Sequence, residues 1–247
     1  MKIAIAGAGG RMGRALIEAV GADRQLSLVV VTDVTGVGNE IGGLKVTDDP
    51  AEIARADVLI DFTRPEGTLA NLEHAQAAVI GTTGFDSKAR TQIAAVSKRI
   101  PVVLSPNFAI GVNVVFKLAE SAAQTLGEGY DVEIIEAHHR HKVDAPSGTA
   151  LKLGEIVARV FKKKDFAFGR QGETGERPVK QIGYHAIRGG DIVGEHTVIF
   201  AGPGERVEVT VRSQSRSTYA LGALRAAKWL KGKPAGLYDM FDVLGLR

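Results

Sequence analysis

Cysteine is absent from this 247-residue chain, which excludes disulfide bonds, thiolate catalysis and metal centres with cysteine ligands. Long apolar runs are also missing: the run Leu28–Val31 is far shorter than the roughly 18 apolar residues that a membrane-spanning helix needs. The N-terminus passes directly into a short apolar run and then glycines, so we expect no signal peptide. These absences predict a cytoplasmic protein with no membrane partner.

Charge of one sign is scarce as well. The 31 Lys and Arg residues against 28 Asp and Glu residues give a formal net charge of +3. Acids and bases are interspersed along the chain, whereas nucleic-acid binders usually concentrate their cations, so we expect no nucleic-acid partner. Hydrophobic residues make up 45% and charged residues 24%, which is typical of a globular protein and excludes a disordered one.

Glycine, in contrast, is abundant, with 30 residues, and the first group of glycines interrupts a regular pattern. Lys2–Ala6 is a short apolar run typical of a buried strand, and glycines follow it at once. Arg14–Val20 has helical spacing, and Leu26–Thr32 is a second apolar run that ends in Asp33. This order predicts a βαβ unit.

The alternation of strands and helices continues to about residue 110 and then changes. Further strands are predicted at Val58–Phe62, Ala78–Ile80 and Val102–Leu104, with helices at 66–75 and 86–98. Later helices are predicted at Val112–Thr125, Thr149–Phe161 and 218–230, strands at Asp131–Glu136, Gln181–Ile187, Ile192–Phe200 and Val207–Arg212, and a long surface loop at 162–179. We therefore predict an α/β fold with a Rossmann-type doubly wound parallel sheet, plus a second α+β domain with an open mixed sheet.

Two domains follow from this change of pattern. Residues 1–109 and 216–247 are predicted to bind a dinucleotide, and residues 110–215 to bind the substrate and to form an oligomer. The apolar alternation on the open sheet would expose hydrophobic strand surface, which favours burial against another copy of the chain.

The glycine turn favours binding of a pyrophosphate. Gly7 permits the tight turn, Gly9 lets the backbone approach an anion, and the following helix offers unpaired N–H groups at its N-terminus. The spacing is G-x-G-x-x-x-G, since Met12 stands at the usual third position and Gly13 follows it. The alternative is a glycine-rich turn without a ligand.

Asp33 strengthens the dinucleotide hypothesis because it ends the second strand, 20 residues after Gly13. A carboxylate there can accept hydrogen bonds from both hydroxyls of an adenine ribose and would repel a 2′-phosphate. Its alternative is an ordinary turn residue at a strand end.

Two further segments follow predicted strands and should lie along the same sheet edge. Gly81-Thr82-Thr83-Gly84 follows Ala78–Ile80, and Ser105-Pro106-Asn107-Phe108 follows Val102–Leu104. Each is weak evidence alone, since turns favour such residues, but the carboxyl edge of a parallel sheet is where ligands bind.

The densest chemistry lies in residues 136–150, EAHHRHKVDAPSGTA, where histidines, Arg140 and Lys142 crowd together. The Ser147-Gly148-Thr149 segment then stands where a helix begins, so its hydroxyls and N–H groups can hold an anion. A cationic loop that leads into a helix N-terminus suits a small dicarboxylate. The alternatives are a solvated charged loop and a metal site, but no carboxylate–histidine spacing stands out, so we predict no metal.

Residues 7–14, GAGGRMGR, taken together with 136–150, closely resemble the dihydrodipicolinate reductase family. Residues 61–68 (DFTRPEGT), 81–85 (GTTGF) and 190–197 (GDIVGEHT) extend the resemblance over essentially the whole chain. The resemblance implies reduction of 4-hydroxy-tetrahydrodipicolinate to tetrahydrodipicolinate with NADH or NADPH, in lysine and diaminopimelate biosynthesis. It also implies a homotetramer.

The resemblance implies a role for each matching position. Hydride would pass from nicotinamide C4 to the substrate, with Lys142 as proton donor and His138 as the second catalytic residue; His139, Gly148 and Thr149 would contact the substrate carboxylates. The implied cofactor residues are Gly7, Ala8, Gly9, Gly10, Arg11, Met12, Asp33, Gly81, Thr82, Thr83, Ser105, Pro106, Asn107 and Phe108. Crowding by cations predicts that Lys142 gives up its proton readily.

One departure concerns the choice of cofactor. Val34 follows Asp33 where many relatives have a basic residue, which removes a partner for a 2′-phosphate, although Arg11 can supply part of that charge. Two other functions remain open: an NAD-sensing protein without turnover, and an NAD-dependent dehydrogenase of another small amino or dicarboxylic acid. Arg216, where the chain returns to the first domain, is interpreted as a hinge.

Overall fold

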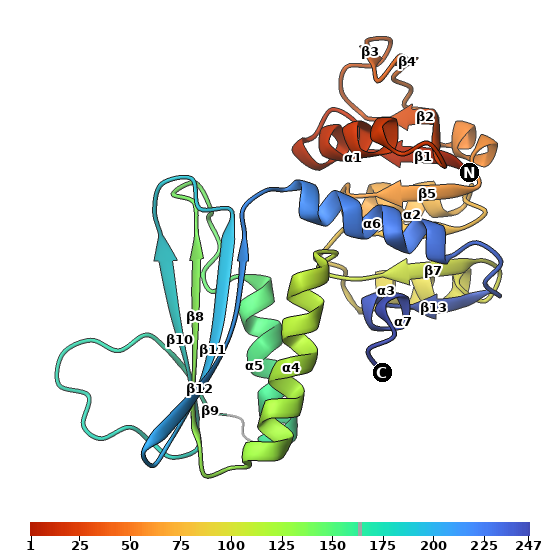
Figure 1. The fold of residues 1–247 in the computed structure, drawn as a ribbon. Helices are drawn as coiled ribbons and strands as arrows, with labels where there is room; N and C mark the ends of the chain where they lie inside the picture. The colour runs from red at the N-terminus through yellow and green to blue at the C-terminus, as the bar shows by residue number, and fades with distance from the viewer. Residues whose placement is uncertain (163–164) are drawn as a thin grey trace. The chain divides into compact units, whose positions relative to one another are not determined.

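The computed structural model describes residues 1–162 and 165–247; Lys163 and Lys164, which fall in the predicted loop, lie outside the described residues. Contacts within the chain divide it into two compact units (Figure 1). The first unit comprises Met1–Ile110 and Arg216–Arg247, and the second comprises Gly111–Ser215.

The first unit contains a six-stranded parallel sheet in the order β13-β7-β6-β5-β1-β2. Its strands are β1 (Lys2–Ala6), β2 (Ser27–Thr32), β5 (Val58–Asp61), β6 (Ala78–Ile80), β7 (Pro101–Leu104) and β13 (Gly236–Tyr238). Side chains on both faces of the central strands are buried, which is why these strands appear in the sequence as unbroken apolar runs.

Helices cover both faces of this sheet, as expected of a doubly wound fold (Figure 1). One face packs against α1 (Arg11–Ala22), α6 (Ser217–Trp229) and α7 (Met240–Leu244). The other packs against the 3-10 helix η1 (Pro50–Arg55), α2 (Pro65–Leu72) and α3 (Ser87–Val96). The sequence did not predict the small hairpin β3 (Glu40–Ile41) and β4 (Leu44–Lys45), nor η1, β13 and α7.

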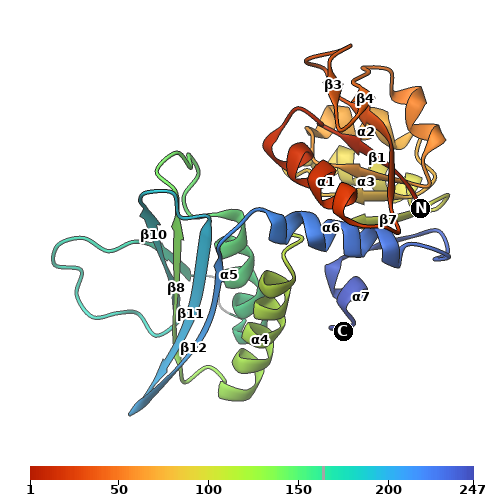
Figure 2. The ribbon, with the colours of Figure 1, turned by 45° about the horizontal axis from the view of Figure 1, so that its top comes forward.

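The second unit contains a five-stranded mixed sheet in the order β12-β11-β8-β10-β9, so the predicted fold class is confirmed. Its strands are β8 (Asp131–His138), β9 (Asp165–Phe168), β10 (Gln181–Arg188), β11 (Gly194–Gly202) and β12 (Glu205–Ser213). Both α4 (Ile110–Leu126) and α5 (Gly148–Phe161) lie against one face, and the other face is open (Figure 2). The prediction of a continuous loop over 162–179 was wrong, because β9 pairs in parallel with β10.

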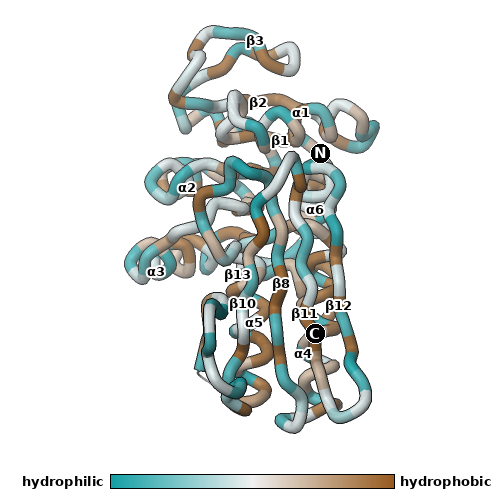
Figure 3. Tube along the Cα trace, turned by 90° about the vertical axis from the view of Figure 1, so that its left-hand side faces the viewer, coloured by the Kyte–Doolittle hydropathy of each residue, from teal (hydrophilic) through white to brown (hydrophobic). Residues whose placement is uncertain are grey.

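Alternation along β8 separates the two faces of this sheet. Val132, Ile134 and Glu136 are buried on the helix-covered face, whereas Glu133 and Ile135 lie on the open face. Seen from the open face in Figure 3, the strands carry both hydrophobic and hydrophilic residues. On this open face the charged Glu133 lies beside the half-buried Ile135, so the face is not uniformly apolar.

Along α4, Val112, Val115 and Ala119 are buried, whereas Val114 and Leu118 are 37% and 51% exposed.

Candidate active site

The glycine turn forms the first part of the candidate site, at the carboxyl end of β1. Gly7 has a φ of +77°, which other residues adopt only with strain, and a Cβ there would lie 3.1 Å from Thr63 Cγ2. Gly10 caps α1 without a side chain, so no side-chain hydrogen bond satisfies the first N–H groups of the helix. These groups can bind the phosphates of a dinucleotide.

Gly13 is the glycine that lets α1 approach the turn. A Cβ at position 13 would lie 2.1 Å from the Gly7 carbonyl oxygen and 2.7 Å from Ala8 Cα. Gly13 therefore permits the close packing of helix against turn that the third glycine of this motif usually permits, although it stands one position later, after Met12. Gly13 was not among the cofactor residues predicted from the sequence, although the altered glycine spacing was evident there.

Asp33 is tied to this turn. Its Oδ2 accepts a hydrogen bond from Gly9 N at 2.9 Å, and its Oδ1 accepts from Thr35 N and Thr35 Oγ1, each at 2.9 Å. Partial burial opposes ionisation, but the hydrogen bonds from Thr35 and Gly9 lower the pKa of Asp33 below its usual value. The neighbouring Val34 side chain is 89% exposed, and Arg11 is also exposed.

The Gly81–Thr83 segment is anchored by the buried carboxylate of Asp61, at the end of β5. Thr82 Oγ1 donates to Asp61 Oδ1 at 3.2 Å, Thr68 Oγ1 lies 2.8 Å from Thr82 Oγ1, and Asn71 Nδ2 donates to Asp61 Oδ2 at 2.8 Å. Gly81 must lack a side chain because a Cβ would lie 2.1 Å from the Phe62 ring. Asp61, which the sequence analysis did not include among the site residues, thus holds Thr82 in place.

The Ser105–Phe108 segment turns at the end of β7. Ser105 Oγ donates to the Asn107 carbonyl oxygen at 2.9 Å, and Pro106 is exposed. Phe108 is 1% exposed and packs against Phe62 with the ring centroids 5.6 Å apart. The Phe108 side chain therefore belongs to the core, and only the backbone of this residue remains to face a cofactor.

These cofactor candidates share one edge of the first sheet. The segments follow β1, β2, β6 and β7, which are parallel, so their carboxyl ends lie at the same edge (Figure 1). The strand order reverses between β1 and β5, and such a switch point is where open α/β sheets bind ligands. The uncapped helix N-terminus, the glycines and the acid at the end of β2 together fit a dinucleotide.

The second part of the candidate residues lies within the second unit alone and begins at the end of β8. His138 is 9% exposed, and its Nδ1 lies 2.5 Å from Glu136 Oε2. Burial lowers the pKa of His138, Lys142 and Arg188 lower it further, and the contact with Glu136 opposes them. For Glu136 itself, burial opposes ionisation, but Arg188 and His138 lower its pKa. Because the ionised carboxylate can only accept, Nδ1 of His138 carries the hydrogen.

Lys142 lies in the loop that follows. Its Nζ donates to both carboxylate oxygens of Asp144, at 2.7 and 2.9 Å. The sequence analysis considered only the cations around Lys142, whereas the structure adds an anion two residues away that pairs with the ammonium group. An ammonium group has three hydrogens, so one remains for a substrate.

The N-terminus of α5 closes the loop. Ser147 is the N-cap, and its Oγ accepts from Ala150 N at 3.2 Å and lies 2.9 Å from His196 Nε2. Gly148 and Thr149 begin the helix, and nothing lies within 4 Å of a Cβ placed on Gly148. Burial lowers the pKa of His196 to about 4, so this histidine is neutral near pH 7.

His139 lies beside the loop with its ring 6.2 Å from that of His141. Within the described residues its Nδ1 is a buried polar atom without a hydrogen-bond partner. In residues 1–162 and 165–247, no three His, Asp or Glu side chains are grouped to hold a metal ion.

Sequence reasoning missed three residues of this second part: Glu136, Arg188 and His196. Each lies on a strand at a position that faces α4 and α5, where a polar side chain is costly unless it is paired. Polar residues in phase with the buried positions of β8, β10 and β11 are a signal that could have found them.

Comparison with known proteins agrees with this arrangement. A family model described as dihydrodipicolinate reductase, N-terminus, matches residues 1–108, and one described as dihydrodipicolinate reductase, C-terminus, matches residues 111–244. The chain belongs to the dihydrodipicolinate reductase family. The 4-hydroxy-tetrahydrodipicolinate reductase of Thiobacillus denitrificans is 55% identical over 265 residues, which cover 100% of this chain and 99% of the relative. The protein of that name from Aromatoleum aromaticum is 55% identical over 266 residues, covering 100% and 96%.

A solved structure of the dihydrodipicolinate reductase family supports the same conclusion. Dipicolinate-bound dihydrodipicolinate reductase from Paenisporosarcina sp. TG-14 has a TM-score of 0.80 and 26% identity, covering 98% of each chain. The resemblance stated from the sequence is thereby confirmed. In the part of the chain that the structure describes, no helix is long and apolar enough to cross a membrane.

Proposed function

We propose that this protein reduces 4-hydroxy-tetrahydrodipicolinate to tetrahydrodipicolinate with NADH or NADPH, as part of lysine and diaminopimelate biosynthesis. The observation that carries the proposal is the loop from His138 to Ser147, which contains a lysine and histidines and is followed directly by the N-terminus of α5. Membership of the dihydrodipicolinate reductase family supports it along the full chain.

The first unit binds the cofactor in this proposal. The glycine turn and the N-terminus of α1 hold the pyrophosphate, Asp33 accepts hydrogen bonds from the adenine ribose, and Gly81–Thr83 and Ser105–Phe108 hold the nicotinamide end. The bound dihydronicotinamide supplies a hydride. The exposed Val34 offers no charge to a 2′-phosphate, so we expect NADH to be used at least as well as NADPH.

The second unit binds and protonates the substrate. The first-turn N–H groups of α5, with Gly148 and Thr149, bind one carboxylate, and His139 offers a further polar contact. Lys142 donates the proton from Nζ, with Asp144 orienting the ammonium group. His138 is the second catalytic residue, and Nε2 is its exchanging nitrogen. General acid catalysis of this kind contributes about 10²–10⁴ in rate.

The cellular setting is part of the proposal. We place the enzyme in the cytoplasm, the setting that we expect for a reductase of lysine and diaminopimelate biosynthesis. We also propose a homotetramer in which the open face of the second sheet is covered. Half-buried Ile135 and the 52% exposed Ile187 on this face supply apolar surface for such a contact.

The direct test follows oxidation of NADH and of NADPH in parallel, at one ionic strength, with freshly generated 4-hydroxy-tetrahydrodipicolinate. Lys142→Ala should lower kcat by about 10²–10⁴ and leave the Kd for NADH unchanged. Lys152→Ala is the matched control, since Lys152 also pairs with an acid, Glu155, but on the exposed side of α5. Tight nucleotide binding with no turnover would favour a nucleotide sensor, and turnover of only another small amino acid would favour the dehydrogenase alternative.

A further inference from the structure

We propose that Glu136 and Arg188 are positioning residues that hold the loop from His138 to Ser147 in its reactive arrangement. This inference rests on the proposed function, because it concerns the same site. Neither residue contacts a reacting atom; each acts through the residues that do.

Glu136 gathers the two ends of the loop on one carboxylate. Its Oε2 lies 2.5 Å from His138 Nδ1, and its Oε1 accepts from Ser147 N at 3.1 Å. His138 begins the loop and Ser147 ends it as the cap of α5. The residue is 1% exposed, so the distance between the two ends is set inside the protein, away from water.

Arg188 fixes the same carboxylate from the neighbouring strand β10, where it stands opposite His138 in register. Its Nη1 donates to Glu136 Oε2 at 2.9 Å and its Nη2 to Oε1 at 2.7 Å. Nη2 also donates to the Asp144 carbonyl oxygen at 2.7 Å. The guanidinium therefore fixes the middle of the loop, beside the residue that pairs with Lys142.

The pair also determines which nitrogen of His138 exchanges a proton. Glu136 accepts from Nδ1, so Nε2 is left for the substrate. The other charged or titratable groups that face His138 are Lys142, Arg188 and His196, and Glu136 is the anion that opposes them. A buried carboxylate with this many donors is costly to lose, because each abandoned donor remains buried.

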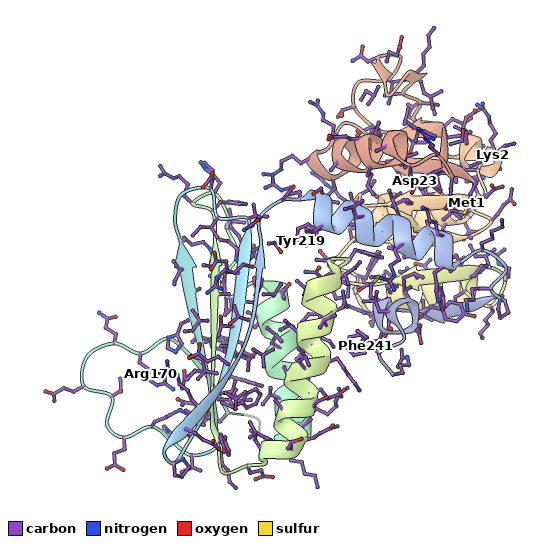
Figure 4. All side chains as sticks on the ribbon, in the orientation of Figure 1. Met1, Lys2, Asp23, Arg170, Tyr219 and Phe241 are labelled. Atoms are coloured by element: carbon purple, nitrogen blue, oxygen red, sulfur yellow. The ribbon has the colours of Figure 1, made fainter. Side chains whose placement is uncertain are left out.

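A second glutamate on the same strand provides the matched control. Glu133 also accepts two hydrogen bonds from one arginine, Arg170 Nη1 at 3.0 Å and Nη2 at 2.8 Å. It lies on the open face of the sheet, opposite to the face that carries Glu136. Figure 4 shows Arg170 on that open side, away from α4 and α5. The effect of losing the Glu136–Arg188 pair, on the helix-covered face, can thus be compared with the effect of losing the Glu133–Arg170 pair, on the open face of the same strand.

The experiment compares Glu136→Gln with Glu133→Gln in the full-length protein. In Glu136→Gln we expect kcat/KM for the substrate to fall about 10- to 100-fold, since small misplacements of reacting groups cost that much. The Kd for NADH should stay within about twofold of the wild-type value, because the substitution affects the substrate-binding loop and not the cofactor-binding residues. The ¹⁵N NMR spectrum should show a mixture of His138 tautomers, and the His138 titration should move to lower pH. Glu133→Gln should match the wild type in all four measurements.

Two outcomes would overturn the inference. One is a Glu136→Gln protein with the wild-type tautomer and titration of His138; the other is a Glu133→Gln protein that loses activity to the same extent. If Glu136→Gln does not fold, the wild-type NMR spectrum still decides, because the proposal requires the hydrogen on Nδ1. This spectrum is independent of turnover, so a failure of the proposed reaction is distinguishable from a failure of the positioning role.

Discussion

Replacement of Gly13 by alanine tests the account of the glycine turn most sharply. The added Cβ would lie 2.1 Å from the Gly7 carbonyl oxygen and 2.8 Å from that of Ala8. Ordinary contacts need about 3.5 Å, so α1 and the turn must separate by up to about 1.4 Å. Both partners are backbone atoms, which cannot rotate away as a side chain can.

Two terms set the size of the effect. Overpacking of this kind costs about 1–3 kcal/mol and sometimes more. Alanine gains about 1 kcal/mol over glycine from helix propensity, which offsets part of the cost. Because the clashing partners are backbone atoms, we take the overpacking cost at its upper end, about 3 kcal/mol, which leaves a net loss of about 2 kcal/mol, or a Tm lower by about 4–8 °C for a chain of this size. The displaced turn should also raise the Kd for NADH by about tenfold or more.

Gly21→Ala in the same helix is the control, because nothing lies within 4 Å of a Cβ at position 21. This variant should gain up to about 1 kcal/mol from propensity alone and bind NADH as the wild type does. Thermal unfolding and fluorescence titration with NADH measure both variants. If Gly13→Ala were as stable as Gly21→Ala and bound NADH equally well, the close packing of α1 on the turn would not exist as described.

Three further predictions concern charge. Asp33→Asn should lower the ratio of kcat/KM for NADH to kcat/KM for NADPH by about tenfold or more. The substitution removes a charged acceptor for the ribose hydroxyls of NADH, and it also removes the charge that repels the 2′-phosphate of NADPH. An equal loss of kcat/KM with both cofactors would refute this role. The pKa of His196 is lowered to about 4, so the unfolded chain binds more protons below pH 6.5. The contribution of the neutral histidine to stability is therefore present above pH 6.5 and is lost as the pH falls towards 4. In urea unfolding of His196→Gln, the free energy of unfolding should decrease less steeply over that pH range than it does in the wild type. For Glu133, burial opposes ionisation, but Arg170, Arg177 and His185 lower its pKa to about 2. Its contribution is present above pH 4.5 and lost as the pH falls to 2, so Glu133→Gln should flatten acid unfolding there; an unchanged slope would show that the carboxylate is equally stabilised when unfolded.

The elements that the sequence predicted well are those with a strong local period. After the exposed Lys2, β1 is apolar through Ala6, and Ala78–Ile80 is apolar throughout, because both faces of their sheet are covered. The helix α5 begins within one residue of its predicted start because Ser147 is a good cap. The strand β13, Gly236–Tyr238, begins with a glycine and ends with a tyrosine, so it does not form a continuous apolar run as Ala78–Ile80 does. Its existence depends on pairing with β7, which no local pattern reveals.

The candidate site divides in the same way. The glycine turn and Asp33 were predictable because their chemistry is local to one βαβ unit. Arg188 was not, because its partner Glu136 is 52 residues away along the chain and meets it only through the register of β10 on β8. The pairing of Lys142 with Asp144 was also not predicted, because the loop carries several cations and the sequence does not determine which of them faces the acid.

The return of the chain to the first unit has a consequence for synthesis of the protein. Ala223, Leu224 and Leu230, in and just after α6, bury the same face of the first sheet as Val79 and Val103, yet the ribosome makes them only after the whole second unit. A nascent chain that has passed Ile110 therefore carries an apolar sheet face open to water, whereas the continuous second unit can fold first. A product terminated at Ser215 should be bound by chaperones or degraded rather than retain partial function.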